Sequence, residues 1–237
     1  MPISPGFIAN SRAQAPFTAD TLILHFDGSD GGTTYTDSGP LSLTVTRLSL
    51  SELDTAQQQF GTASMLMTSN GDGAELAVSG DRWHLTSDSS FEMFVRFNVL
   101  PSVAADDGTL MTTRHPAASS RGFSFLVNTS DQLQMVMWDG TGSVVLNITG
   151  TTALSVNTWY HVGVSRTSGG LVEVYLDGSV EVSGTPSGTT TDGFELTIGH
   201  DATSVTRFVD GWIDEVAVNK TAARDLSIVP TVPFVVP

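Results

Sequence analysis

The feature that most restricts the fold of this chain is a succession of short segments in which apolar and polar residues alternate. The clearest is residues 90–99, SFEMFVRFNV, where the odd-numbered positions are apolar and Glu92, Arg96 and Asn98 lie between them. Successive side chains of a β-strand point to opposite faces, so this segment predicts a strand with its odd positions in a core. Similar segments recur between residues 21 and 218, separated by Gly, Asp, Ser and Thr.

The order of these segments indicates an all-β protein. Strands that follow one another without intervening helices predict an antiparallel sandwich or barrel, and we expect a two-sheet antiparallel jelly-roll sandwich. Asp177-Gly178 lies between two predicted strands and predicts a tight hairpin, because a type I′ turn needs positive φ at both central positions. No segment has a clear helical period, and residues 51–59 and 221–226 are the ones that can form one or two helical turns.

The two ends of the chain differ from its body. Residues 1–20 contain three prolines among scattered apolar residues, and we expect them to form an extended N-terminal arm. Residues 21–237 then form one sandwich domain, whose last ten residues are an apolar, proline-bound tail. Phe7, Ile8 and Phe17 would be exposed in an isolated arm, so we expect them to contact neighbouring subunits or a particle.

The composition restricts partners and compartment. With 10 basic and 25 acidic residues the net charge is −15, so we expect no binding to nucleic acid. The chain has no cysteine, which excludes disulfides and thiolate sites and fits folding in a reducing cytosol. The first twenty residues lack the pattern of a signal peptide, and no apolar run is long enough to predict membrane insertion.

Patterns for catalysis are weak. Glycan hydrolysis needs two carboxylates close together on one face, and the nearest pair, Asp214-Glu215, is adjacent in sequence and so predicted to point to opposite faces. Neither Gly-x-Ser-x-Gly nor His-Glu-x-x-His occurs. His25 and His161 lie in predicted strands and are interpreted as structural. We therefore expect no enzymatic activity and no catalytic residues.

Three tryptophans are candidates for ligand stacking. Trp159 and Trp212 lie in predicted strands, where core packing is the favoured interpretation and ligand stacking the alternative. Trp138 is followed by Asp139 and a glycine-rich loop, so it is predicted at a strand end, with exposed and buried positions both open. The predicted ligand-binding set is Trp138, Asp139, His115 and Arg121.

Several segments together resemble the laminin-G-like, concanavalin A-like lectin–glucanase superfamily, in particular its members in bacterial and phage structural proteins. The segments that carry the resemblance are residues 25–39, 55–67, 91–97, 157–166, 172–178, 196–200, 211–223 and 230–234. The resemblance extends over about residues 21–234 and implies the same jelly-roll sandwich. It is less informative about function, because this sandwich serves lectins, glycan hydrolases, adhesion modules and virion proteins.

The resemblance implies further expectations. Members of the superfamily often hold a structural calcium between the first and last strands, and Asp27, Gly28 and Asp214 occupy the matching places. It also implies a virion surface or tail-associated decoration protein, made in the host cytoplasm without a signal peptide, that adheres to host-surface glycans. The alternative is a free carbohydrate-binding module, and a glycan hydrolase is the least favoured. As partners we expect further copies of this chain, as a trimer, or other virion proteins.

Overall fold

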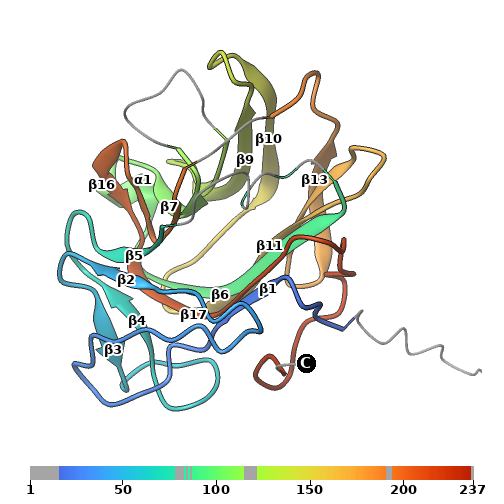
Figure 1. The fold of residues 1–237 in the computed structure, drawn as a ribbon. Helices are drawn as coiled ribbons and strands as arrows, with labels where there is room; N and C mark the ends of the chain where they lie inside the picture. Colours follow the sequence, from blue (N-terminus) through green and yellow to red (C-terminus); the bar gives the residue numbers. More distant parts are fainter. Residues whose placement is uncertain are drawn as a thin grey trace, which may run out of the picture.

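The computed structural model describes residues 16–77, 83, 85, 87–114, 122–190 and 194–235. In Figure 1 two large antiparallel sheets lie one above the other, so that each presents one face to the other. One α-helical turn, α1 (Pro101–Ala104), and a small hairpin of β15 (His200–Asp201) and β16 (Ser204–Phe208) complete the described elements. The predicted jelly-roll sandwich is confirmed.

The first sheet has eight strands, in the order β13-β12-β11-β6-β17-β4-β3, with β1 also paired to β17. Its strands are β1 (Thr21–Leu24), β3 (Glu52–Asp54), β4 (Ser64–Met67), β6 (Ser89–Val99), β11 (Trp159–Arg166), β12 (Val172–Leu176), β13 (Ser179–Gly184) and β17 (Asp210–Asn219). The longest of them, β6 and β17, lie side by side at its centre.

The second sheet has seven strands, in the order β10-β9-β8-β7-β14-β5-β2. Its strands are β2 (Thr46–Leu48), β5 (Gly73–Leu76), β7 (Gly108–Thr112), β8 (Phe123–Val127), β9 (Gln132–Trp138), β10 (Val144–Ala153) and β14 (Leu196–Ile198). Neighbours in this order are often distant in sequence, as in β7 and β14, which is the crossed connectivity of a jelly roll.

The core lies between the two sheets. Phe91, Met93, Val95 and Phe97 of β6 are all buried in it, which confirms the predicted facing of this strand. Across the interface, the ring of Phe91 stacks on that of Phe123 with 5.3 Å between the centroids. Alternation in β6 therefore leaves its even positions on the outer face of the eight-stranded sheet, away from the second sheet.

The hairpin prediction is confirmed and the helix predictions are wrong. Asp177 and Gly178 have φ of 46° and 79° and join β12 to β13. Residues 52–54 form β3 because they pair with β4, and this pairing overrides any local helical preference. Residues 221–226 form no helix. The turn of α1 was not predicted; Pro101 lies at its start, where a missing N–H costs no hydrogen bond.

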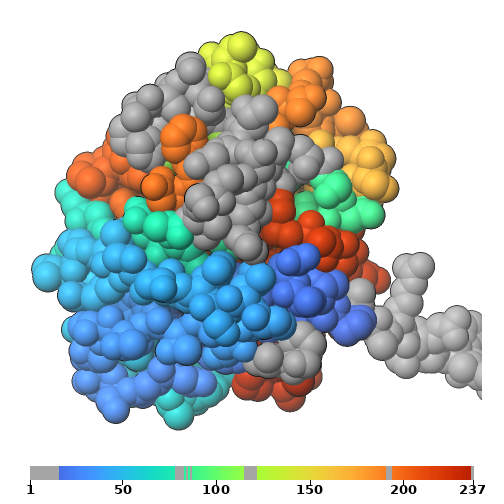
Figure 2. Space-filling model, viewed as in Figure 1, coloured from blue at the N-terminus to red at the C-terminus, as the bar shows by residue number. Residues whose placement is uncertain are grey.

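The described chain ends meet on the outer face of the eight-stranded sheet. The ring of Phe17 contacts that of Phe234 edge-on at 5.3 Å, and the Arg224 guanidinium lies 3.7 Å above the Phe17 ring. Figure 2 shows the dark-blue start of the described chain beside the red C-terminal segment. Phe17, predicted as a contact to neighbours, is thus 9 % exposed and packed on its own chain. Phe7 and Ile8 lie outside the described residues.

Among the described residues, no helix is long and apolar enough to cross a membrane.

Candidate functional site

A row of side chains crosses five neighbouring strands on the outer face of the eight-stranded sheet. In register, Trp159 of β11 lies opposite Arg96 of β6, and Arg96 lies opposite Trp212 of β17. Trp212 is in turn opposite Leu66 of β4, and Leu66 is opposite Glu52 of β3. We call these five residues the outer row. All five are partly exposed.

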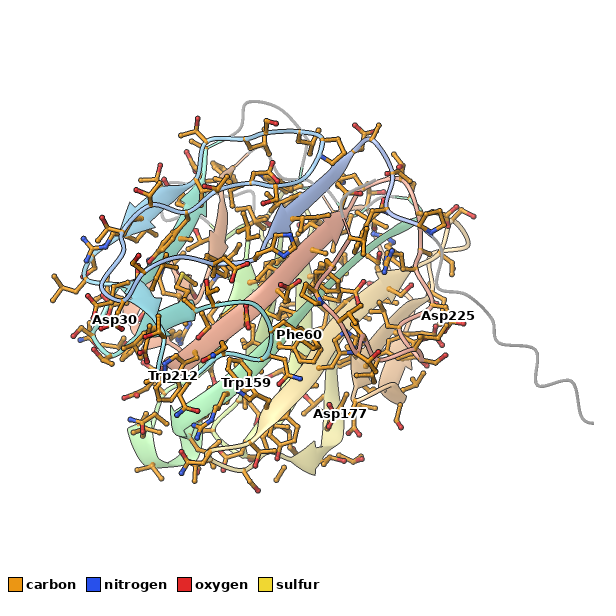
Figure 3. The ribbon with its side chains drawn as sticks, turned by 90° about the horizontal axis from the view of Figure 1, so that it is seen from below. Asp30, Phe60, Trp159, Asp177, Trp212 and Asp225 are labelled. Atoms are coloured by element: carbon orange, nitrogen blue, oxygen red, sulfur yellow. The ribbon has the colours of Figure 1, made fainter. Side chains whose placement is uncertain are left out.

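The facing of the outer row follows from the strands that carry it. Val95 and Phe97 point into the core, so Arg96 between them points outward. Ile213 is likewise buried in the core, which turns the preceding Trp212 outward. Figure 3 looks onto this face from below and labels both outer-row tryptophans, with Phe60 nearby. The favoured interpretation that Trp159 and Trp212 pack in the core is therefore wrong.

The centre of the outer row is fixed by specific contacts. Trp212 Nε1 donates to Asp54 Oδ2 at 2.7 Å, which orients the indole. The guanidinium of Arg96 lies 5.1 Å from the Trp212 ring centroid, a cation–π contact, and Arg96 Nη1 donates to Asn157 Oδ1 at 3.0 Å. These bonds hold a planar aromatic surface and a cation in place before any ligand arrives.

Carboxylates surround this centre. Glu52 ends the outer row on one side, and Asp54 lies next to Trp212. Asp210 lies on the far side, where Asn98 Nδ2 donates to its Oδ1 at 3.2 Å and burial raises the pKa of its carboxyl group. The surface therefore combines aromatic faces with one guanidinium and several oxygen acceptors. Such a surface suits a ligand with apolar faces and many hydroxyl groups.

The ligand-binding set predicted from the sequence lies elsewhere. Trp138 is 9 % exposed at the end of β9, and the Arg114 guanidinium lies 5.1 Å from its ring centroid. Asp139 Oδ1 accepts hydrogen bonds from Thr141 Oγ1 and from the main-chain N–H groups of residues 141 and 143, and these bonds lower its pKa. Asp139 thus shapes the turn after β9. His115 and Arg121 lie outside the described residues.

The proposed calcium ligands are engaged with main-chain groups. Asp214 Oδ2 accepts the N–H groups of Gln59 and Phe60 at 2.8 and 3.0 Å, and its Oδ1 accepts the next N–H at 2.9 Å. Asp27 accepts the N–H and hydroxyl of Thr62, whose Oγ1 also accepts the Gly28 N–H. Calcium needs about 6–8 oxygen ligands, and within the described part of the chain no three acidic or histidine side chains gather. Oxygens of both carboxylates are thus engaged with main-chain and hydroxyl groups, and calcium binding at this place stays a prediction.

Asp214 and Glu215 are on the same face, so the predicted opposite facing is wrong. A β-bulge in β17 between Asp214 and Ala217 adds one residue and gives Glu215 a φ of 50°. Glu215 Oε1 pairs with His25 Nδ1 at 2.8 Å, and its Oε2 accepts the Phe234 N–H at 2.7 Å. Both carboxylates are buried and hold loops and the C-terminal segment.

The buried positions change how this acidic pair titrates. Burial raises the pKa of Asp214 to about 7, with the neighbouring Glu215 charge acting in the same direction. The hydrogen bond to Glu215 raises the pKa of His25. The bulge does leave a signal in the sequence, because the core positions change from the odd-numbered Ile213 to the even-numbered Val216 and Val218. The interpretation of His161 as structural agrees with its position in the structure, where it is buried with its Nε2 3.0 Å from Glu92 Oε2.

The two sheets, with their crossed strand connectivity, form a jelly-roll sandwich, and this is the fold of lectin-like receptor-binding domains. A family model described as the concanavalin A-like lectin/glucanases superfamily matches residues 68–228, and the chain belongs to this superfamily. The resemblance drawn from the sequence is thereby confirmed. No curated protein matches the chain significantly.

Solved structures share the fold at low sequence identity. The botulinum neurotoxin type G receptor binding domain has a TM-score of 0.65 and 13% identity, covering 90% of this chain and 50% of its own. The binding domain of Paraclostridial mosquitocidal protein 1 gives 0.66 and 11%, covering 85% and 48%. The botulinum neurotoxin serotype D ligand binding domain, in complex with N-acetylneuraminic acid, gives 0.63 and 14%, covering 87% and 48%. This chain spans about half the length of each.

Proposed function

We propose that this chain is a non-enzymatic carbohydrate-binding domain on a virion surface or tail, and that it binds glycans through the outer row. The observation that carries the proposal is the alignment of Trp159, Arg96 and Trp212 on one exposed sheet face. Membership of a lectin superfamily supports it, as do neighbours that are receptor-binding domains.

Sugars suit this surface for physical reasons. The C–H face of a sugar ring is apolar and packs on an indole, while its hydroxyl groups both donate and accept hydrogen bonds. Arg96 supplies N–H donors beside Trp212, and Asp54 supplies carboxylate oxygens on the other side of that ring. Because the side chains are already held by Asn157 and by each other, little conformational entropy is lost on binding.

The acidic residues support a role without catalysis. A glycosidase needs two accessible carboxyl groups flanking the bond that it cleaves. Asp214 and Glu215 are on one face, but both are buried beneath the loop at residues 59–60 and the C-terminal segment. Their oxygens accept main-chain N–H groups, so a sugar would have to displace these to reach them.

The placement on a virion rests on the resemblance of segments such as residues 25–39 and 211–223 to phage structural proteins. The same resemblance supports assembly with further copies, as a trimer, or with other virion proteins. The alternative, a free carbohydrate-binding module, differs in one observable. A virion protein is found in purified particles, whereas a free module stays in the supernatant when particles are sedimented.

A glycan array tests the binding proposal. We expect the full chain to bind a defined set of glycans, and Trp159→Ala and Trp212→Ala each to abolish or strongly weaken that binding. Val205→Ala is the matched control, because Val205 is an exposed apolar residue of β16, outside both large sheets. The proposal is refuted if the chain binds no glycan, or if both tryptophan variants bind as the unmodified chain does while folding normally.

A further inference from the structure

We infer that the outer row binds an extended, uncharged glycan chain that lies across the strands, rather than one terminal sugar. This inference rests on the proposed function and specifies its ligand. It follows from the length of the row, from the order of its side chains and from the charges around it.

The length of the row exceeds a single sugar. Neighbouring strands are about 4.8 Å apart, so Trp159 and Trp212, two strands apart, are separated by about 10 Å of sheet. From β11 to β3 the row spans four such gaps, or about 19 Å. One sugar ring covers one indole. A ligand that contacts both indoles and reaches Leu66 must therefore contain several rings in a line.

The order of the side chains also suits a chain. The two indoles offer apolar faces, and Arg96 lies between them in register. A sugar on each indole leaves a middle sugar above the guanidinium, where hydroxyl oxygens accept its N–H groups. Leu66 continues the apolar strip beyond Trp212. The side chains thus alternate in kind along one line instead of converging on a single pocket.

The charges around the row favour an uncharged chain. Arg96 is the one cation of the outer row, and it already lies over the Trp212 ring and bonds Asn157. Glu52, Asp54 and Asp210 lie along the line or beside it, and the whole protein has a net charge of −15. A glycan with a carboxylate or sulfate on each unit would meet this negative field along its length.

Titration calorimetry with oligosaccharides of defined length tests the inference. The probes are laminari- and cello-oligosaccharides of one to six sugars, any uncharged glycan found on the array, and alginate oligosaccharides of matched length. For the uncharged series that binds, we expect affinity to rise at least about tenfold from two sugars to five, as successive contacts become intramolecular, and then to level off. Alginate of the same length should bind at least about tenfold more weakly.

Variants show which residues cause the gain in affinity with oligosaccharide length. Trp159→Ala and Trp212→Ala should each remove most of the gain with length, Leu66→Ala a smaller part, and Val205→Ala none. Equal affinity for one sugar and for six, or tighter binding of alginate, would overturn the inference while leaving carbohydrate binding intact. If both tryptophan variants keep the full gain in affinity with oligosaccharide length, the glycan binds elsewhere on the protein and the inference is overturned. Absence of binding to every glycan would overturn the proposed function itself.

Discussion

The buried pair of Glu92 and Arg224 gives a quantitative test of how the C-terminal segment is held. Arg224 Nε donates to Glu92 Oε1 at 2.8 Å, and the two side chains are 4% and 1% exposed. The other carboxylate oxygen of Glu92 lies 3.0 Å from His161 Nε2. Alternation in β6 predicted an outward Glu92, and the structure places it outward but beneath this segment.

The magnitude follows from desolvation. Removing one partner of a buried ion pair leaves the other charge in a medium that solvates it poorly, at a cost of about 3–5 kcal/mol. We therefore expect Glu92→Met to lower the free energy of unfolding by about 3–5 kcal/mol, and Arg224→Met by a similar amount. The double variant Glu92→Met with Arg224→Met removes both charges and fills the volume, so it should be more stable than either single variant.

Urea denaturation of the four proteins gives the coupling between the two sites. Asp20→Ala is the control, because Asp20 is exposed, and its effect should be within about 0.5 kcal/mol. Single variants that each cost less than about 1 kcal/mol would show that the pair is solvated in solution. Additive effects in the double variant would show that the two residues stabilise the protein independently, and would refute the desolvation argument.

Three further predictions concern stability. Phe97→Asp should lower the free energy of unfolding by several kcal/mol, because it places an unpaired charge in the core; a normal melting temperature would contradict the assignment of β6. Burial raises the pKa of Asp214 from 3.8 to about 7, so its contribution to stability is fully present below pH 3.8 and is lost as the pH rises through about 7. Asp214→Asn should therefore flatten the dependence of the free energy of unfolding on pH, measured by denaturation between about pH 4 and 8. If calcium binds near Asp27 and Asp214, EDTA should lower the melting temperature, because a ligand of the folded state stabilises it. An unchanged melting curve in EDTA would contradict this prediction.

The alternation of apolar residues was sufficient for the fold, and the register between strands decided the site. In residues 159–166 the even positions include Tyr160, Val162 and Val164, and the odd positions after Trp159 are small or polar, so alternation favours an outward Trp159. The structure turns Val162 and Val164 into the core and therefore Trp159 outward. That Trp159 shares a line with Trp212 depends on both strands pairing with the same residue of β6, which no local pattern encodes.

Long-range partners explain the remaining differences. Glu92 was assigned correctly to the outer face, but its burial depends on Arg224, 132 residues away in sequence. The bulge at Glu215 shifts the alternation of β17 by one position, so its core residues change from Ile213 to Val216 and Val218. The sequence therefore carries a trace of the bulge, whereas the burial of Glu92 depends on a distant segment that local periodicity does not report.

The meeting of the two ends of the described chain has a mechanical consequence. Thr21 at the start of β1 pairs with Asn219 at the end of β17, and the strands are antiparallel, so the chain enters and leaves the sheet at the same end of one strand pair. Tension applied between the ends would first separate Phe17 from Phe234 and then open the β1–β17 ladder one hydrogen bond at a time. Loaded in this way the ladder is unzipped rather than sheared. The β1–β17 ladder should therefore open at a lower force when both ends are pulled apart. It should resist a higher force when one end is pulled against a ligand bound to the outer row.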